Sequence, residues 1–180
     1  MCQEERNIYI FGTIDFNMSK YVIENLQKFN YNDENIYMYI NSDGGDMDSG
    51  FAIIDQMELI TPKIFTIVMG QALSMACVIT MFGSYGYRFS TKSSFLMMHN
   101  TNLDIGLNDI YTHMIMSEFM KKDSDKKTDK ILHKMCKNPK DIPIIKEKIK
   151  NNFWMNPEDA IKYNVIDRIW DKETYNKFKG

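Results

Sequence analysis

Cysteine is scarce in this chain, and its scarcity excludes several classes of protein. The 180 residues include three cysteines, Cys2, Cys77 and Cys136. Because they are odd in number, widely spaced and lack any CxxC pair, we expect neither a disulfide framework nor a zinc site, and the default location is a reducing cytoplasm. Cys77 lies in an apolar segment, which favours a core residue over a reactive thiol.

An excess of charge of one sign is also missing. Lysine and arginine number 22 against 24 acidic residues, giving a formal net charge of -2. Nucleic acids and anionic membranes bind concentrated basic surfaces, so neither is an expected partner. The N-terminal MCQEERN has no basic segment followed by a long apolar run, so no secretory signal is expected. No nucleotide-binding or metal-ligand motif is present, and no cofactor or metal is expected.

Only one long run without charge occurs, IFTIVMGQALSMACVITMF at 64–82. Its length approaches that of a membrane span. However, Pro62 precedes it, a turn is predicted at Gly70-Gln71, and β-branched residues give way to small ones. These features favour a buried strand followed by a buried helix that begins near Leu73.

Short apolar strands alternate with helical patterns along the rest of the chain, which predicts an α/β fold with crossover connections. At 44% hydrophobic and 13% aromatic residues, 180 residues can form a single globular domain, 1–180. We expect strands at 8–12, 36–40, 64–68, 87–90 and 94–98. We expect a helix capped by Asn17 with Met18, Val22, Leu26 and Phe29 on one face, a second with Phe51, Ile54 and either Met57 or Glu58, and a long helix at about 107–135.

Three features occur at the ends of these apolar runs: Ser74, the Gly44-Gly45 pair and His99. Alone, each has an ordinary interpretation, because the serine could cap a helix, the glycines could form a simple turn, and the histidine could be a satisfied structural residue. Together they are the parts of a serine hydrolase. A serine needs a base to remove its proton, and the tetrahedral intermediate needs backbone N–H donors for its oxyanion.

Five motifs in order, NIYIFGTI, IYMYINSDGGDMDSGFAIIDQM, GQALSMACVITMFG, RFSTKSSFLMMH and FWMNPEDAIKYNVIDRI, resemble those of the caseinolytic protease (ClpP) family of ring-forming serine peptidases. The resemblance runs from about Ile8 to Ile169, and a divergent or phage-type member is one interpretation. It implies a ClpP/crotonase-type α/β fold of repeated ββα spiral units. The head would comprise about 8–105 and 150–170, and a protruding handle helix about 107–136.

The resemblance also implies roles for individual residues in a serine endopeptidase that cleaves unfolded proteins or peptides inside a ring chamber. Ser74 would be the nucleophile, His99 the base, and the N–H groups of Gly45 and Met75 the oxyanion hole. The substrate backbone would bind by strand addition along Gly44, Asp46 and Met47. The expected assembly is a homo-oligomer, a heptameric ring or double ring. An ATP-dependent unfoldase is a possible partner, although the short N-terminus before 8–12 weakens that expectation.

The sequence departs from the family where the third member of the triad belongs, because Asn152 occupies the position of the aspartate. In chymotrypsin-like enzymes the corresponding Asp-to-Asn change lowers turnover about 10⁴-fold. We therefore expect weak or conditional activity. Asp104 and Asp159 are alternative carboxylates without support from spacing.

Two rival functions stay open. One is a catalytically inactive ring subunit with a structural or regulatory role, and it is motivated by Asn152 and by the altered segment NTNLDIGLND after His99. The other is a crotonase-like acyl-CoA enzyme, against which the pairing of Ser74 with His99 argues. A further departure is Asp43, which stands where the family usually has proline and which we expect to face solvent.

Overall fold

The computed structural model describes residues 5–99, 110–136 and 139–179, without the side chains of 110–120. The chain divides into two compact units. The first comprises Met1–Met98 and Trp154–Gly180, and the second comprises His99–Phe153.

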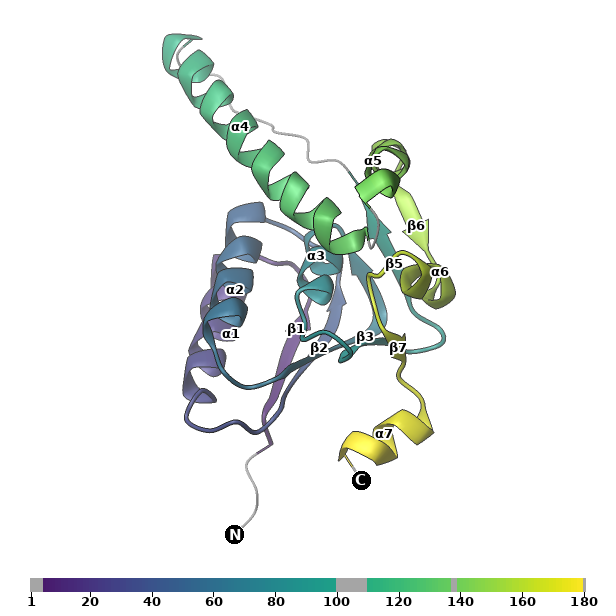
Figure 1. Cartoon of the computed structure of the whole chain (residues 1–180). Coiled ribbons are helices and arrows are strands. Elements are labelled where there is room, and N and C mark those ends of the chain that lie inside the picture. The colour runs from purple at the N-terminus through teal and green to yellow at the C-terminus, as the bar shows by residue number, and fades with distance from the viewer. Residues whose placement is uncertain (1–4, 100–109, 137–138, 180) are drawn as a thin grey trace. The chain divides into compact units, whose positions relative to one another are not determined.

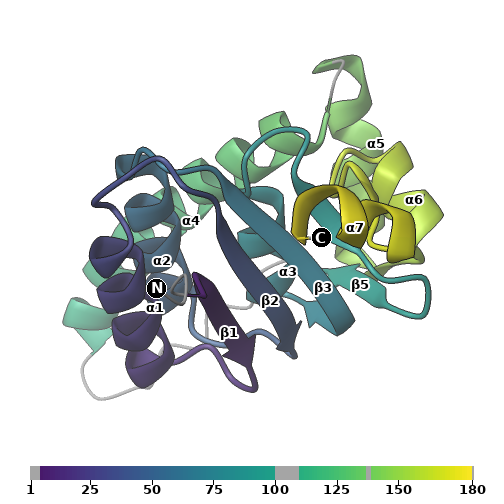
Figure 2. The ribbon, with the colours of Figure 1, turned by 90° about the horizontal axis from the view of Figure 1, so that it is seen from below.

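The first unit is built on a parallel sheet (Figures 1 and 2). Its main path runs in the order β1-β2-β3-β4-β7, and β5 pairs with both β3 and β6. The strands are β1 (Asn7–Phe11), β2 (Ile36–Ser42), β3 (Ile64–Leu73), β4 (Arg88–Ser90), β5 (Phe95–Met98), β6 (Phe153–Met155) and β7 (Arg168–Ile169). Parallel neighbours require crossover connections, and α1 and α2 supply them between β1, β2 and β3. The predicted α/β fold is confirmed.

Helix α1 (Phe16–Lys28) follows the expected apolar spacing, but it begins earlier than predicted. The prediction that Asn17 caps it is wrong, because the Asp15 carboxylate accepts the N–H of Met18 at 2.8 Å. Both Asp15 and Asn17 have side chains that can cap a helix, and Asp15 is the N-cap in the structure. Val22 and Leu26 are buried as expected.

Helix α2 (Met47–Leu59) lies beside α1 in both views (Figures 1 and 2). Its N-cap is Asp46, whose carboxylate accepts the N–H of Ser49 at 2.7 Å. Met57 is buried and Glu58 is exposed, which decides between the two alternatives for the apolar face.

The uncharged run 64–82 forms β3 followed by α3 (Met75–Met81), as expected for a buried strand and helix. The prediction of a turn at Gly70-Gln71 is wrong, because β3 continues to Leu73 and changes its partner instead. It pairs with β4 at Thr66 to Val68 and with β5 at Gln71 to Leu73. Within the described residues, no helix is both long enough and apolar enough to span a bilayer.

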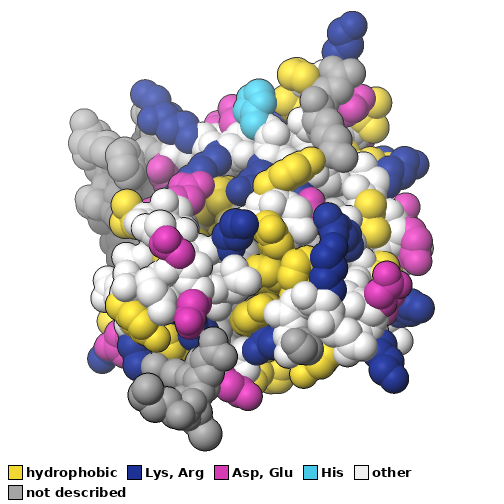
Figure 3. Space-filling view, turned by 60° about the horizontal axis from the view of Figure 1, so that its bottom comes forward, with side chains coloured by type: hydrophobic (Ala, Val, Ile, Leu, Met, Phe, Trp, Pro, Cys, Tyr) yellow, Lys and Arg dark blue, Asp and Glu magenta, His cyan; other side chains and the backbone are white. Residues whose placement is uncertain are grey.

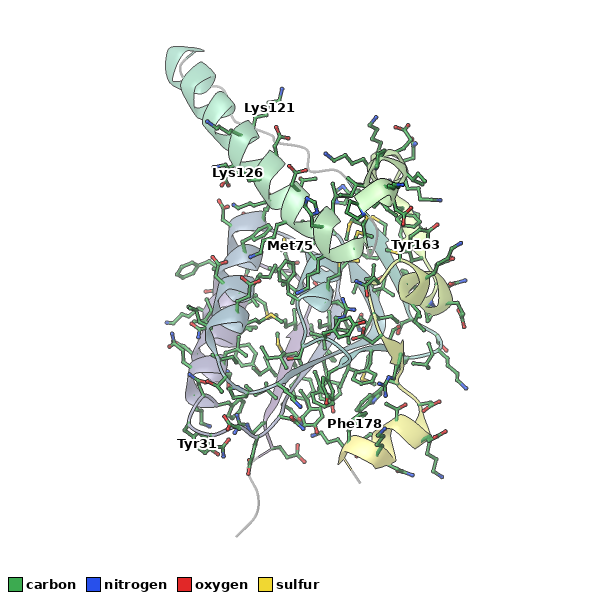
Figure 4. The ribbon with its side chains drawn as sticks, viewed as in Figure 1. Tyr31, Met75, Lys121, Lys126, Tyr163 and Phe178 are labelled. Atoms are coloured by element: carbon green, nitrogen blue, oxygen red, sulfur yellow. The ribbon has the colours of Figure 1, made fainter. Side chains whose placement is uncertain are left out.

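One face of the sheet carries an aromatic cluster that includes Tyr37, Phe65 and Phe89. Helix α7 (Lys172–Lys179), which the sequence analysis did not anticipate, contributes Phe178 (Figure 4). The Phe178 ring lies 5.2 Å from that of Phe65, and the Tyr37 hydroxyl donates to the Phe178 carbonyl at 2.7 Å. Figure 3 shows hydrophobic side chains gathered between basic ones on the underside.

An ion pair between the buried Arg88 and the partly buried Asp167 joins β4 to the chain just before β7. The Arg88 guanidinium donates to both carboxylate oxygens of Asp167, at 2.9 and 2.7 Å, and to the Asn164 carbonyl at 2.8 Å. Burial alone would raise the pKa of Asp167. The hydrogen bonds and charge of Arg88 and the N–H of Gly86 outweigh burial, so the pKa lies below its ordinary value.

The second unit contains α4 (Ile110–Met135), the short 3-10 helix η1 (Pro139–Asp141) and α5 (Ile142–Lys150). The long predicted helix is thus confirmed from Ile110, and 107–109 lie outside the described residues. Lys146 of α5 pairs with Asp129 of α4 at 3.2 Å.

Helix α6 (Pro157–Lys162) belongs to the first unit and begins after Asn156, whose amide oxygen accepts the N–H of Asp159.

Candidate active site

Ser74 lies at the junction between β3 and α3 in an unusual backbone conformation. Its φ of 52° and ψ of -120° fall in a region that residues other than glycine rarely occupy. The Ser74 N–H donates to the Met97 carbonyl of β5 at 2.8 Å. Ser74 is the N-cap residue of α3, but its hydroxyl makes no capping hydrogen bond to that helix. A sharp bend held by two strands instead presents this side chain.

The Gly44-Gly45 pair lies directly against this bend. Gly44 has φ +93°, and a Cβ built on it would lie 2.6 Å from the Leu73 carbonyl oxygen and 2.8 Å from the Ser74 Cβ. Gly45 has φ +149°, and a Cβ there would overlap the Ile14 backbone. Both glycines are therefore required by close backbone approach as well as by the turn itself.

The backbone hydrogen bonds around this turn do not involve the N–H groups of Gly45 and Met75. Ile14 donates to the Gly44 carbonyl at 2.8 Å and accepts from the Asp46 N–H at 2.7 Å. Successive amides of an extended segment point to opposite sides, so the Gly45 N–H faces away from Ile14. Among the described residues, no hydrogen bond is recorded for the N–H of Gly45 or of Met75.

These two amides belong to segments that touch each other. The Cβ position of Gly44 is 3.0 Å from the Met75 nitrogen. Met75 is the first residue of α3, and its side chain packs so closely on Gly50 of α2 that a Cβ there would overlap it (Figure 4). An oxyanion is stabilised by N–H donors that converge on it, so the closeness of these two segments is compatible with such a site.

The other residues expected along the substrate segment have structural roles as well. Asp46 caps α2, and Met47 is its partly buried first residue. Asp43 is exposed, as expected, and its carboxylate accepts a hydrogen bond from the Gln71 side-chain amide.

His99 and Asn152 lie in the second unit, whereas Ser74 lies in the first. His99 directly follows β5 and is partly buried, and Asn152 directly precedes β6 and is exposed with φ 55°. Their neighbouring strands β5 and β6 are paired. Of the alternative carboxylates, Asp159 lies in the first turn of α6, and Asp104 lies outside the described residues.

Sequence reasoning missed Ser42, Ile14 and Gln71. The Ser42 hydroxyl accepts the Gly44 N–H at 3.0 Å and so fixes the turn, and a serine two residues before a turn glycine is a recognisable local signal. Ile14 acts through its backbone, which no side-chain pattern reveals. Cys77 is buried as expected, and burial raises the pKa of its thiol to about 12.

Comparison with known proteins agrees with this architecture. The family model of Clp protease matches residues 1–173. The chain is 32% identical to an ATP-dependent Clp protease proteolytic subunit of Streptococcus suis over 171 residues, which are 93% of this chain and 86% of the relative. Proteins of the same name from Streptococcus mutans and Streptococcus pyogenes are 31% and 33% identical with the same coverage. This chain therefore belongs to the Clp protease family.

Proposed function

We propose that this ClpP-like protease is a serine-type endopeptidase in which Ser74 is the nucleophile. The observation that carries the proposal is the strained bend at Ser74, packed against Gly44, with the Met75 nitrogen close to the same glycine. Strained backbone persists where the surrounding structure holds it, and such sites are often functional. Membership of the Clp protease family supports peptide-bond hydrolysis as the reaction.

The proposed reaction has two stages. Ser74 Oγ attacks the peptide carbonyl carbon while His99 accepts the hydroxyl proton, and the oxygen of the tetrahedral intermediate binds the amides of Gly45 and Met75. His99 then gives that proton to the departing amine, leaving an acyl-enzyme. Water, deprotonated by His99, hydrolyses the ester and restores Ser74.

In this proposal Asn152 orients His99 through its side-chain carbonyl. A neutral amide gives the imidazolium less electrostatic help than a carboxylate, so turnover should be low or conditional. Asn152 is also exposed, with no buried environment to strengthen its interaction. Replacing it with aspartate should therefore raise kcat.

The substrate would be an unfolded protein or a peptide. Ile14 occupies one side of the segment at 44–46, and the opposite side is where a substrate strand would pair. By analogy with its relatives, the chain would be the proteolytic subunit of a homo-oligomeric ring supplied by an ATP-dependent unfoldase.

Labelling with a fluorophosphonate probe tests this proposal directly. The assembled protein should form one adduct, on Ser74, that mass spectrometry can locate. Ser74→Ala should abolish the adduct and the hydrolysis of a fluorogenic peptide. Ser93→Ala, which removes an exposed serine elsewhere in the first unit, should change neither. A folded, assembled protein that gives no Ser74 adduct would exclude serine catalysis.

The second candidate is a catalytically inactive ring subunit, and the neutral Asn152 is what favours it. Kinetics of Asn152→Asp separate the two functions. If the site is otherwise competent, restoring the carboxylate should increase kcat at least tenfold. If neither the native chain nor Asn152→Asp hydrolyses peptide while both assemble, a structural or regulatory role is the better account.

A further inference from the structure

The ladder between β2 and β3 is interrupted immediately before the candidate site. The paired residues run without a break as far as Ile40 with Val68, and the next pair is Ser42 with Ala72. One residue of β2 therefore lies opposite three residues of β3. Main-chain hydrogen bonds alone do not hold the two strands in a regular register here.

Side chains fill this interruption. Gly70, at φ +100°, brings the β3 backbone so close to Asn41 that a Cβ there would lie 3.0 Å from the Asn41 amide oxygen. One residue further along, the Gln71 side-chain amide donates to the carboxylate of Asp43. This hydrogen bond joins the end of β2 to the end of β3.

The two ends lead directly to the proposed oxyanion donors. Asp43 precedes Gly44 and Gly45, whereas Gln71 lies three residues before Ser74. The Ile14 backbone holds the turn from its far side. The hydrogen bond between Asp43 and Gln71 links the turn after β2 to the end of β3. The relative position of these two segments sets the distance between the proposed oxyanion donors.

That spacing matters because an oxyanion must lie about 2.7–3.1 Å from each donor. A misplacement of about 1 Å at a reacting centre can cost about 100-fold in rate. We propose that Asp43 and Gln71 form a positioning pair that fixes the Gly45 amide relative to the Met75 amide. The inference rests on the proposed serine peptidase function. In this proposal both side chains act through the backbone of the turn and not on the reacting atoms.

Steady-state kinetics with a fluorogenic peptide test the pair. Asp43→Ala and Gln71→Ala should each lower kcat about tenfold or more with little change in KM, because the oxyanion forms only after the substrate is bound. Asp43→Asn retains an acceptor oxygen for the Gln71 amide and should restore near-native kcat. The double alanine variant should be no worse than either single variant. Asp55→Ala removes an exposed charge of α2 and serves as the control.

Several results would overturn the proposal. If Asp43→Asn is as impaired as Asp43→Ala, charge rather than the hydrogen bond is what matters. If the loss is in KM and confined to peptides with basic residues, Asp43 selects the substrate instead. Additive losses in the double variant would mean that the two side chains act separately.

Amide hydrogen exchange separates this inference from the proposed function. In the Ser74→Ala background, Asp43→Ala should speed exchange at 44–46, and Asp43→Asn should not. Unchanged exchange in Asp43→Ala means that the pair does not hold the turn, whatever the activity. Faster exchange in a protein whose native form shows no Ser74 adduct means that the serine mechanism fails while the pair still positions the turn.

Discussion

Replacing Ser74 with glycine should stabilise the fold while abolishing catalysis. At φ 52° and ψ -120° a residue with a Cβ is strained, which costs about 1–3 kcal/mol. Ser74→Ala keeps that Cβ and therefore the strain, whereas Ser74→Gly removes it. Glycine also makes the unfolded chain more flexible, which lowers the stability of the folded state by about 0.5–1 kcal/mol. The glycine variant should thus be about 1 kcal/mol more stable than the alanine variant.

Comparing these two variants isolates the backbone effect, because both lack the hydroxyl. For a chain of this size, about 1 kcal/mol corresponds to a Tm difference of about 2–4 °C. Differential scanning calorimetry at equal subunit concentration would measure it. The control is Ser19 of α1, a buried helical serine. There the order should reverse, with Ser19→Gly about 1 kcal/mol less stable than Ser19→Ala.

The reasoning is refuted if Ser74→Gly is equal to, or less stable than, Ser74→Ala while the Ser19 pair behaves as expected. That outcome would mean that the bend at Ser74 stores no strain. The interpretation of the bend as a held catalytic conformation would then lose its energetic basis.

Three further predictions concern the first unit and one cysteine of the second. Phe178→Ala should lower stability by about 2 kcal/mol, because a half-buried ring is lost from the aromatic cluster, and Asn176→Ala is the exposed control for thermal unfolding. Peptide mapping after iodoacetamide treatment at pH 8 should find Cys77 unmodified in the folded protein, since burial raises its pKa to about 12, whereas the partly exposed Cys136 should react; rapid native labelling of Cys77 would contradict its burial. Because the pKa of Asp167 is lowered by Arg88, its stabilisation is fully present above the ordinary value of 3.8 and is lost as pH falls through the folded pKa. Asp167→Asn should lower the free energy of unfolding by about 3–5 kcal/mol at pH 7. In urea unfolding at a series of pH values, the variant should lose less stability than the native chain as pH falls below 3.8. An equal loss in both proteins would show that the ion pair does not cause the acid sensitivity.

Hydrophobic periodicity was enough to predict most of the regular structure. Each apolar run expected as a strand contains one, because β-branched and aromatic residues bounded by turn residues favour extended backbone. The choice between Met57 and Glu58 needed the structure, because positions three and four residues after Ile54 both lie on the same side of a helix as Ile54. The cap of α1 was misplaced because Asp15 and Asn17 carry equivalent local signals, and only the path of the chain selects between them.

Two errors have a different origin, since they depend on contacts distant in sequence. Gly70 is typical of a turn, yet β3 continues through it because β5 supplies new partners to Gln71 and the residues after it. The C-terminal segment at 172–179 is strongly charged, and a local reading does not predict that it contributes Phe178 to an aromatic cluster. Its aromatic partners lie about 90 to 140 residues earlier in the chain.

The closeness of the two segments that form the candidate site follows from the topology. Parallel neighbouring strands end at the same edge of a sheet, so the turn after β2 and the bend after β3 had to lie close together. What the sequence could not reveal is which amides are already occupied. Ile14 pairs with the Gly44 carbonyl and the Asp46 N–H, and the Gly45 N–H has no hydrogen-bond partner among the described residues. This depends on a backbone contact that carries no residue signature.

The arrangement also separates two contributions to the proposed chemistry. Ser74 and both proposed oxyanion donors belong to the first unit, whereas Asn152 belongs to the second. In serine proteases the oxyanion hole and substrate binding alone retain about 10³–10⁴-fold catalysis over water when a triad residue is removed. In the proposed site, a neutral residue at position 152 would therefore weaken the base and leave the other proposed groups in place. Such a protein would keep a low basal rate that assembly or a bound partner could raise by ordering His99, with no new chemical group required.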